Sequence, residues 1–466
     1  MKVRTAVGAA IVLLATWEGC ATYHPLPLDQ KAEKQALAPP DMRAVTLEAQ
    51  AIHHPLLKPV QLDPARGFTP EEVAVVAVLT NPQLKAIRDQ RALAGAQVIQ
   101  AGLLPNPVAS FGQDKPAGGN TQGTVTAYTT QLGFDLTSLL TYSLRKEAAR
   151  AQAQAVDLDV AWQEWQVAQA ARMAALHVLA LGEELPLARQ AEKDARQTMD
   201  AMDRAARTGA VSGAEEAGWR SAWLQAQDRL LLLEQEQARE RQGLNQLIGM
   251  PPEAAFPLRA GPALPEEQAI AEEGSLADGL GERRLDLLAL KKGYESEDKQ
   301  LRIAIRSQFP NIGIDLSHAR DTSNIVTNGY GVALALPLFD RNQGRIAYEE
   351  ATRRQLYDEY MARLFAARAE VAQILSDLKA VQARRRASQE TLPSLKTSAE
   401  GVERALALGA ADLPSLQQAR EAYLAQAMAE VRLRAEEADL GVALEIASGR
   451  YLPGDAPNQQ PAEEPK

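Results

Sequence analysis

An internal repeat constrains the fold of this chain more than any single motif does. Pro105-Asn106 recurs 205 positions later as Pro310-Asn311, and Phe134-Asp135 recurs at the same separation as Phe339-Asp340. A second set of matches, 200 positions apart, pairs Gly209, Arg220, Ala222, Leu224 and Gly249 with Gly409, Arg420, Ala422, Leu424 and Gly449. Chance matching of two Ala-rich helices explains the Ala and Leu pairs but not the others. The sequence therefore predicts two copies of one unit.

Each copy contains one very long predicted helix. Residues 139–207 and 341–407 carry small and apolar residues at three- and four-residue spacing, with Pro186 and Pro393 as the internal prolines. Aromatic residues make up 5% of the chain and apolar residues 46%, a composition typical of long helices. A helix of about 70 residues spans roughly 100 Å. We expect residues 214–248 and 413–447 to fold back as antiparallel return helices.

Between the landmarks of each copy the pattern changes to that of strands. Residues 108–111 and 124–128 flank a turn-rich loop in the first copy. In the second copy, Ile312, Ile314 and Leu316 alternate with small or polar residues, and positions 331–336 alternate in the same way. We expect strands of about ten residues, a length that crosses a bilayer at a tilt. In a soluble sheet each strand would have one buried and one solvated face, and in a membrane it would face lipid on one side and a water-filled lumen on the other.

The N-terminus has the pattern of a secretory signal. A basic start is followed by an apolar run over 6–15 and then by Gly19 and Cys20, the one cysteine of the chain. A small residue before a lone cysteine resembles the bacterial lipoprotein signal, which implies acylation of Cys20. From 22 to 66 the chain is rich in proline without helical period, so we expect an extended arm over the rest of the protein. Thr69, followed by Pro70, predicts a helix start.

The strand count bears on the oligomeric state. No stretch offers about 20 uninterrupted apolar residues, so the sequence predicts no transmembrane helix. Four strands cannot close a barrel, and open strand edges are costly in hydrocarbon. Three chains would supply about 12 strands and leave a lumen, whereas two would supply about 8, whose interior side chains fill. A trimer is the smallest solution that leaves a channel.

Other function classes have weak support. The net charge of -10 disfavours nucleic-acid binding. A nucleophile elbow and a phosphate-binding loop are absent from the sequence, and Gly329-Tyr330-Gly331 lacks the third glycine of a dinucleotide loop. The five histidines, His24, His53, His54, His177 and His318, show no metal-protease spacing. We therefore predict no enzyme activity, no cofactor and no metal site.

Together these features resemble the TolC-type outer-membrane efflux proteins over residues 20 to 452. The resemblance rests on the predicted lipidated N-terminus with 23–28, the two repeats, residues 103–107 at the first strand and the segment 336–345, Leu-Pro-Leu-Phe-Asp-Arg-Asn-Gln-Gly-Arg. That last segment is similar to the branch serving heavy-metal and other cation exporters. The first copy departs from it at 135–140.

The resemblance implies a mainly α fold with a small β part. In it, long antiparallel coiled-coil helices of the two repeats form an α-barrel, and each chain adds four strands to a trimeric 12-stranded transmembrane β-barrel. It also implies a homotrimer in the cell outer membrane, lipid-anchored and extending into the periplasm. The trimer would be the exit duct of a tripartite pump, passively conducting metal cations or drugs from an inner-membrane transporter that a periplasmic adaptor connects to it.

The expected organisation divides the chain into six parts. They are a signal peptide (1–19), an arm with lipidated Cys20 (20–67), repeat 1 (68–248), a connecting equatorial segment (249–280), repeat 2 (281–452) and a disordered tail (453–466).

Two groups of candidate functional residues follow from the resemblance. The adaptor-docking turns would be Thr208, Gly209, Ala210, Val211 and Ser212 in repeat 1, and Leu408, Gly409, Ala410, Ala411 and Asp412 in repeat 2. A gate would involve Glu400, Glu403 and Arg404, whose other interpretation is a solvated outer face of the helix. The alternative function is a lipid-anchored periplasmic coiled-coil adaptor or scaffold. An adaptor of that kind would normally have one helical hairpin, and this sequence predicts two.

Overall fold

The structure is a computed structural model that describes residues 21–261 and 276–450. The predicted signal peptide, Cys20, the tail 453–466 and residues 262–275 of the connecting segment lie outside the described residues. The chain divides into two units, one up to Pro40 and one from Asp41 on. No helix among the described residues is long and apolar enough to cross a membrane.

The arm is less extended than expected. In the first unit, α2 (Gln30–Ala36) begins after Asp29, whose side chain accepts from the backbone N–H of Ala32 at 2.8 Å. In the second unit, α3 (Met42–Gln50) buries Val45 and Ala49 against the core. The expectation of an arm without helices was therefore wrong, because good helix formers with an Asp cap outweigh the scattered prolines.

Repeat 1 follows the predicted order of elements. It runs through α4 (Pro70–Thr80), α5 (Pro82–Ala101), β1 (Val108–Asp114), β2 (Ala127–Asp135), α6 (Thr137–Arg207) and α7 (Gly213–Leu247). Thr69 caps α4 in a capping box with Glu72, and Asn81 caps α5 before a first-turn proline. The second strand lies further along the chain than the predicted 124–128, because its pairing with β3 continues to the Asp135 landmark.

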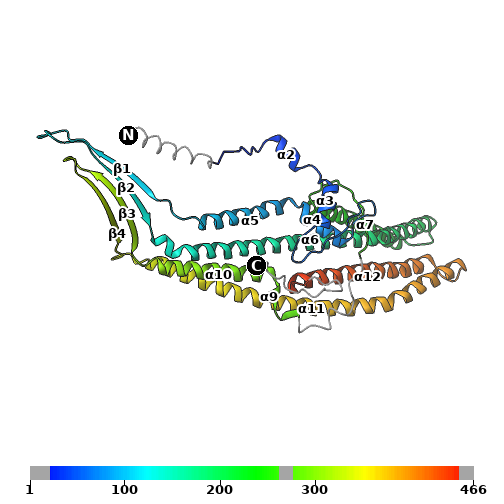
Figure 1. Ribbon diagram of the computed structural model, residues 1–466. Coiled ribbons are helices and arrows are strands. Elements are labelled where there is room, and N and C mark those ends of the chain that lie inside the picture. The colour runs from blue at the N-terminus through cyan, green and yellow to red at the C-terminus, as the bar shows by residue number, and fades with distance from the viewer. Residues whose placement is uncertain (1–20, 262–275, 451–466) are drawn as a thin grey trace. The chain divides into compact units, whose positions relative to one another are not determined.

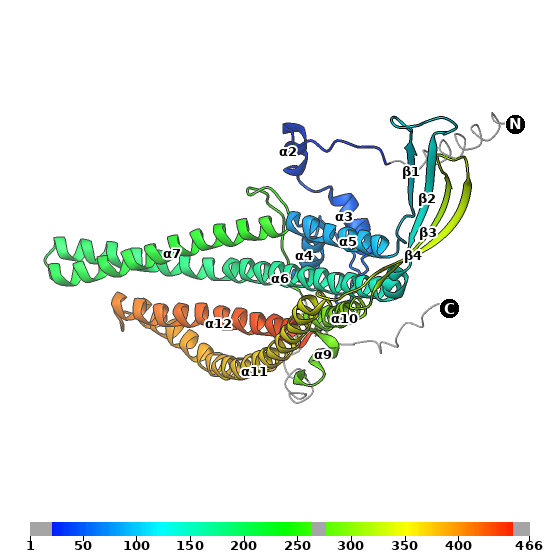
Figure 2. The same ribbon diagram turned by 90° about the vertical axis from the view of Figure 1, so that its left-hand side faces the viewer.

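Repeat 2 has the same order. It runs through α9 (Leu280–Arg283), α10 (Leu285–Arg306), β3 (Asn311–Arg320), β4 (Val326–Ala335), α11 (Gln343–Ala407) and α12 (Leu413–Ser448). The long helices contain 71 residues in α6 and 65 in α11, and both continue through their internal prolines. Figure 1 shows the strands at one end of these helices, and Figure 2 shows α7 along α6 and α12 along α11.

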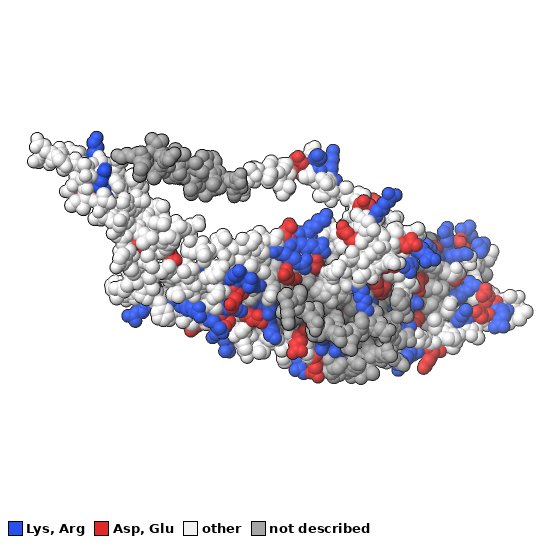
Figure 3. All heavy atoms as spheres, viewed as in Figure 1, with Lys and Arg blue, Asp and Glu red and all other residues white. Residues whose placement is uncertain are grey.

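The four strands form one antiparallel sheet in the order β1-β2-β3-β4. Phe134 pairs with Ile314, so the central pairing joins the two repeats. The strands contain 7 to 10 residues, and β1 is shorter than expected. Apolar side chains on the outer strands are exposed, among them Phe111, Val332 and Leu334. Figure 3 shows few charged side chains over the strands and many over the helices.

The helices next to the sheet follow the same sequence of neighbours as the strands. α5 packs on α6, α6 on α10 and α10 on α11. The two repeats therefore lie side by side, with β1 and α5 on one margin and β4 and α11 on the other (Figure 2).

Candidate docking turns, gate and repeat junction

The two predicted docking turns have the same local geometry. Gly209 and Gly409 adopt φ of 74° and 73°, in the left-handed region that favours glycine. In each turn the residue after the glycine donates its N–H to a carbonyl five residues earlier, from Ala210 to Ala205 at 2.9 Å and from Ala410 to Ala405 at 2.8 Å. This is the Schellman arrangement of a helix end.

Each turn then starts its return helix with a polar cap. Ser212 Oγ accepts from the backbone N–H of Glu215 at 3.2 Å, and the Glu215 carboxylate accepts from the Ser212 N–H at 2.9 Å. In the second turn the Asp412 carboxylate accepts from the Ser415 N–H at 2.9 Å. These hydrogen bonds to Ser212 and Ser415 lower the pKa of Glu215 and of Asp412.

The two turns are exposed except at one residue in each, and these two residues occupy equivalent positions in the repeats. Val211 and Ala411 are half-buried, whereas the other eight residues of the two turns are exposed. A Cβ added at Gly209 or Gly409 would meet no atom within 4 Å. The turns therefore present backbone and small side chains to solvent, with free space around both glycines.

Near their turns the two hairpins are in contact. Arg420 on α12 binds Asp194 on α6 at 3.1 Å, and Thr198 donates its hydroxyl to Gln417 Oε1 at 3.3 Å. Asp194 and Thr198 are buried. The structure therefore brings the return helix of repeat 2 against the long helix of repeat 1.

The candidate gate residues lie on α11 beside this contact, and in the described part of the chain no ion pair joins Arg404 to Glu400 or Glu403. Glu403 binds Arg420 on α12 at 2.7 Å. Arg404 Nε donates to the backbone carbonyl of Glu400 at 3.2 Å. Arg420 thus bridges carboxylates from α6 and α11. Sequence reasoning noted Arg420 only as a repeat match with Arg220, because the 226-residue separation from Asp194 hides their pairing.

A buried polar cluster joins the repeats at the middle of α6 and near the C-terminal end of α12. Arg172 Nη1 on α6 donates to Glu445 Oε2 on α12 at 2.6 Å, and Arg172 Nη2 lies 3.4 Å from Glu71 Oε1 on α4. Gln169 also donates to Glu445, at 3.1 Å. Burial raises the pKa of Glu445, and the Arg172 guanidinium opposes that rise.

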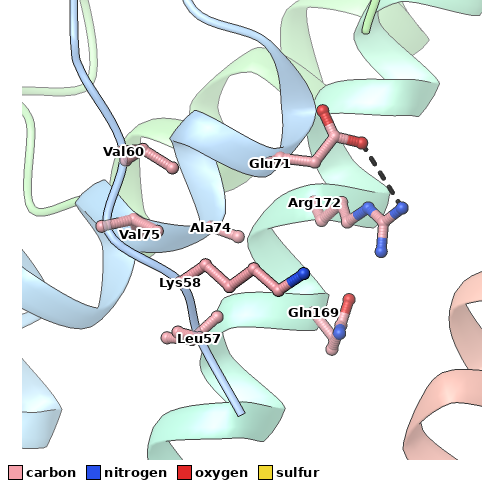
Figure 4. A pocket seen from close by; sticks show the side chains of 8 residues that line it. All are labelled: Leu57, Lys58, Val60, Glu71, Ala74, Val75, Gln169 and Arg172. Atoms are coloured by element: carbon pink, nitrogen blue, oxygen red, sulfur yellow. Dashed lines mark ion pairs between the residues drawn. The ribbon is translucent and has the colours of Figure 1, made fainter. Parts of the chain in front are cut away.

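A small cavity adjoins this cluster (Figure 4). Its volume is about 30 Å³, room for a water molecule and too little for a transported solute. It is lined by Leu57, Lys58, Val60, Glu71, Ala74, Val75, Gln169 and Arg172. The cavity therefore belongs to the packing of residues 57–60 on α4 and α6.

Two histidines, His54 in the segment before α4 and His177 in α6, have opposite environments. The side chain of His54 is buried; its Nδ1 accepts from the N–H groups of Leu56 and Leu57, and its Nε2 donates to Ala161 O at 3.1 Å. Burial lowers the pKa of His54. His177 binds Asp439 of α12 at 2.6 Å, and this hydrogen bond raises the pKa of His177. Among the described residues, no three His, Cys, Asp or Glu side chains form a metal-binding group.

Comparisons with known proteins agree with this architecture. The profile of a family described as outer membrane efflux protein matches residues 75–250 and 276–450. Protein CyaE of Bordetella pertussis is 28% identical over 285 residues, which are 57% of this chain and 59% of CyaE. The chain thus aligns with less than two thirds of that relative's length.

Solved structures share the fold at low sequence identity. The structure of CusC superposes with a TM-score of 0.66 at 16% identity, covering 86% of this chain and 99% of CusC. The outer-membrane channel OprN superposes with a TM-score of 0.69 at 15% identity, covering 93% of this chain and 99% of OprN.

Proposed function

The chain belongs to the outer membrane efflux protein family, and we propose that it forms, as a homotrimer, the exit duct of a tripartite efflux pump. In this role it makes and breaks no bond. It passively conducts substrates, metal cations or organic compounds such as drugs, from an inner-membrane transporter across the outer membrane.

The observation that carries the proposal is that the edge strands of the sheet and the outermost helices lie on the same two sides of the chain. The sheet leaves β1 and β4 as edges, and α5 and α11 are the outer helices on the same sides. Unpaired strand edges are costly in hydrocarbon, so each chain needs a neighbour on both sides. Three chains give about 12 strands, enough for an open lumen.

Helix length supports a duct that reaches well beyond the membrane. The 71 residues of α6 correspond to roughly 100 Å. The turns at 208–212 and 408–412 lie at the ends of the long helices away from the strands (Figure 2). We assign them the docking of a periplasmic adaptor, which links the duct to its pump.

Gating belongs to the same end of the molecule. Glu400, Glu403 and Arg404 precede the second turn, and Arg420 connects Glu403 to the buried Asp194. Breaking the Arg420 ion pairs would let α11 and α12 move away from α6. Acylation of Cys20 would add a lipid anchor to the membrane attachment made by the strands.

Membrane conductance separates this proposal from a lipid-anchored adaptor or scaffold. The purified full chain, added to a planar bilayer, is expected to give stepwise ion conductance. In outer-membrane extracts, the protein is expected to run on gels as a heat-modifiable trimer band. A protein that floats with vesicles without conducting, and that shows no trimer band, would be an anchored scaffold. Labelling with radioactive palmitate that is lost in Cys20→Ser would establish acylation separately.

Docking has its own test. A photocrosslinker at Ser212 or Asp412 is expected to capture a periplasmic adaptor in cells. Capture of this chain alone, with export intact, would remove docking from these turns and leave the channel role standing.

A further inference from the structure

The four joints between strands and helices meet at one end of the sheet. Val108 pairs with Gly133, Gly133 with Asp315 and Asn311 with Ala335, so the helix-side ends of the four strands lie at the same end of the sheet in a staggered row. We use the name collar for these joints with the adjoining helical turns, residues 101–107, 135–146, 302–310 and 336–345.

Hydrogen bonds connect the joints into one surface. Tyr142 donates its hydroxyl to Gly102 O at 3.1 Å, which ties the end of α5 to α6. Arg306 Nη1 donates to Leu140 O at 3.0 Å, which ties α10 to α6. Asn342 Nδ2 donates to Ala304 O at 2.7 Å, which ties α11 to α10. The collar therefore crosses all four helices next to the sheet.

Large apolar side chains of the collar are exposed. Phe309 is 61% exposed, just before β3, and Phe339 is 94% exposed, just after β4. Leu104 and Leu140 are exposed in the other two joints, and Leu338 is exposed beside Phe339. These residues continue the exposed apolar surface of the strands onto the first turns of the helices.

The collar is basic in an acidic chain. Its ranges contain six Lys and Arg residues and two Asp residues, whereas the whole chain has a net charge of -10. The two acids are occupied locally, since Asp135 accepts from the Thr137 N–H and Asp340 accepts from the Asn342 N–H. The six basic and two acidic side chains leave these ranges with a formal net charge of +4.

Arg306 and Arg341 are the arginines best placed to meet an anion. Both are exposed, and neither has a carboxylate partner among the described residues. Arg306 lies three residues before Phe309, and Arg341 lies two residues after Phe339. By contrast, Arg302 and Arg345 bind Asp298 and Glu349 on their own helices.

We propose that the collar binds the phosphate headgroups of anionic phospholipids in the leaflet that the helices leave, with Arg306 and Arg341 on the phosphates and Phe309 and Phe339 at the acyl boundary. The proposal rests on the proposed channel function, which puts the strands in a bilayer. A guanidinium matches phosphate with two parallel hydrogen bonds, and basic residues beside apolar ones are the pattern of a membrane interface. The net positive charge selects anionic over zwitterionic lipid.

The test measures lipid binding to the detergent-solubilised full-length trimer. Dioleoylphosphatidylglycerol and dioleoylphosphatidylcholine are titrated separately, and bound lipid is counted by native mass spectrometry. We expect the wild type to prefer the phosphatidylglycerol. Arg306→Gln with Arg341→Gln should weaken its binding about fivefold per arginine, or about 1 kcal/mol each. Phosphatidylcholine binding should not change.

A matched pair controls for net charge. Arg368→Gln with Arg386→Gln removes two exposed arginines of α11 away from the collar and should bind both lipids as the wild type does. Equal weakening in this control, or unchanged phosphatidylglycerol binding in the collar variant, overturns the proposal.

Three further outcomes bear on the collar. Dissociation of the collar variant into single chains would mean that a second copy covers the surface. Altered ion selectivity with unchanged lipid binding would mean that the arginines line the lumen. Both dissociation and altered selectivity would overturn the proposal. Conductance of the same wild-type preparation is measured in parallel. Conductance without lipid preference overturns the lipid site alone, whereas lack of conductance is a failure of the channel function.

Discussion

Arg172 lies at a buried ionic junction between the repeats. It is 3% exposed and stands between two carboxylates, Glu445 on α12 and Glu71 on α4. Removing one partner of a buried ion pair leaves an uncompensated charge, which costs more than the pair contributes.

We therefore expect Arg172→Met to lower the free energy of unfolding by about 3–5 kcal/mol. Arg384→Met is the control, because Arg384 and Glu436 form an exposed pair, 63% and 48% exposed, worth about 1 kcal/mol or less. Guanidinium unfolding followed by circular dichroism measures both. Equal losses in the two variants would mean that burial of the Arg172 pair adds nothing.

His54 makes the packing of its own segment, which precedes α4, sensitive to acid. Its pKa is lowered, so the native state binds this proton less well than the unfolded chain does. The contribution of His54 to the stability of the folded state is therefore complete above the unfolded pKa of about 6.5 and is lost as pH falls below it. Protonation of Nδ1 would also remove the acceptor for Leu56 and Leu57.

Hydrogen exchange at the amides of Leu56 and Leu57 reports this directly. Their protection factors, corrected for intrinsic rates, are expected to fall between pH 7 and pH 5. In His54→Asn, which keeps a side-chain acceptor without titrating, they should stay level over that range. His177 has the opposite sign, because its raised pKa gives stabilisation that is present below about pH 6.5 and lost as pH rises. His177→Gln should therefore not flatten the fall at Leu56 and Leu57.

Among the elements, the two turns were readable from the sequence and the links between hairpins were not. Glycine after a helix end marks its own turn, so the bounds of α6, α7, α11 and α12 were close to those predicted. The position of β2 was missed, because Thr124, Val125 and Thr126 have strand propensity while pairing with β3 decides the actual strand. The partner of Glu403 was missed for the same reason: Arg420 reaches it only through tertiary packing.

The turns lend themselves to a test at this scale. Gly209→Leu with Gly409→Leu is expected to abolish efflux-dependent resistance, because the larger side chains occupy the free space that an adaptor would use. Positive φ costs a non-glycine residue about 1 kcal/mol at each site. Trimer abundance in the outer membrane should stay near normal.

Asparagine at the same two positions is the control, because it tolerates the left-handed conformation with a smaller side chain. Resistance assays and immunoblots of outer membranes measure both pairs. Full resistance in the leucine pair would show that the turns do not dock an adaptor.

For the whole molecule, the proposed trimer requires β1 of one chain to meet β4 of the next. Phe111 on β1 and Tyr330 on β4 are 70% and 86% exposed, which makes them accessible reporters of those edges. With Cys20→Ala as background, Phe111→Cys with Tyr330→Cys should give crosslinked dimers and trimers with a flexible bismaleimide, and no larger species.

Either single-cysteine variant is the control and should give at most a dimer. A ladder that stops at the dimer in the double variant, or that continues past the trimer, would mean that the ring does not close at three. The readout is band size on denaturing gels of crosslinked membranes.

The pairing of β2 with β3 also governs the order in which the chain can fold. Phe134 and its partner Ile314 are 180 positions apart, whereas β1–β2 and β3–β4 are joined by short loops. Local hairpins form faster than contacts that close a long loop, so the α6–α7 hairpin should be complete while β2 still lacks its neighbour. In the proposed outer-membrane duct, β2 keeps an open strand edge until residues up to 320 have reached the periplasm, and during that interval the chain is most exposed to aggregation and to holding chaperones.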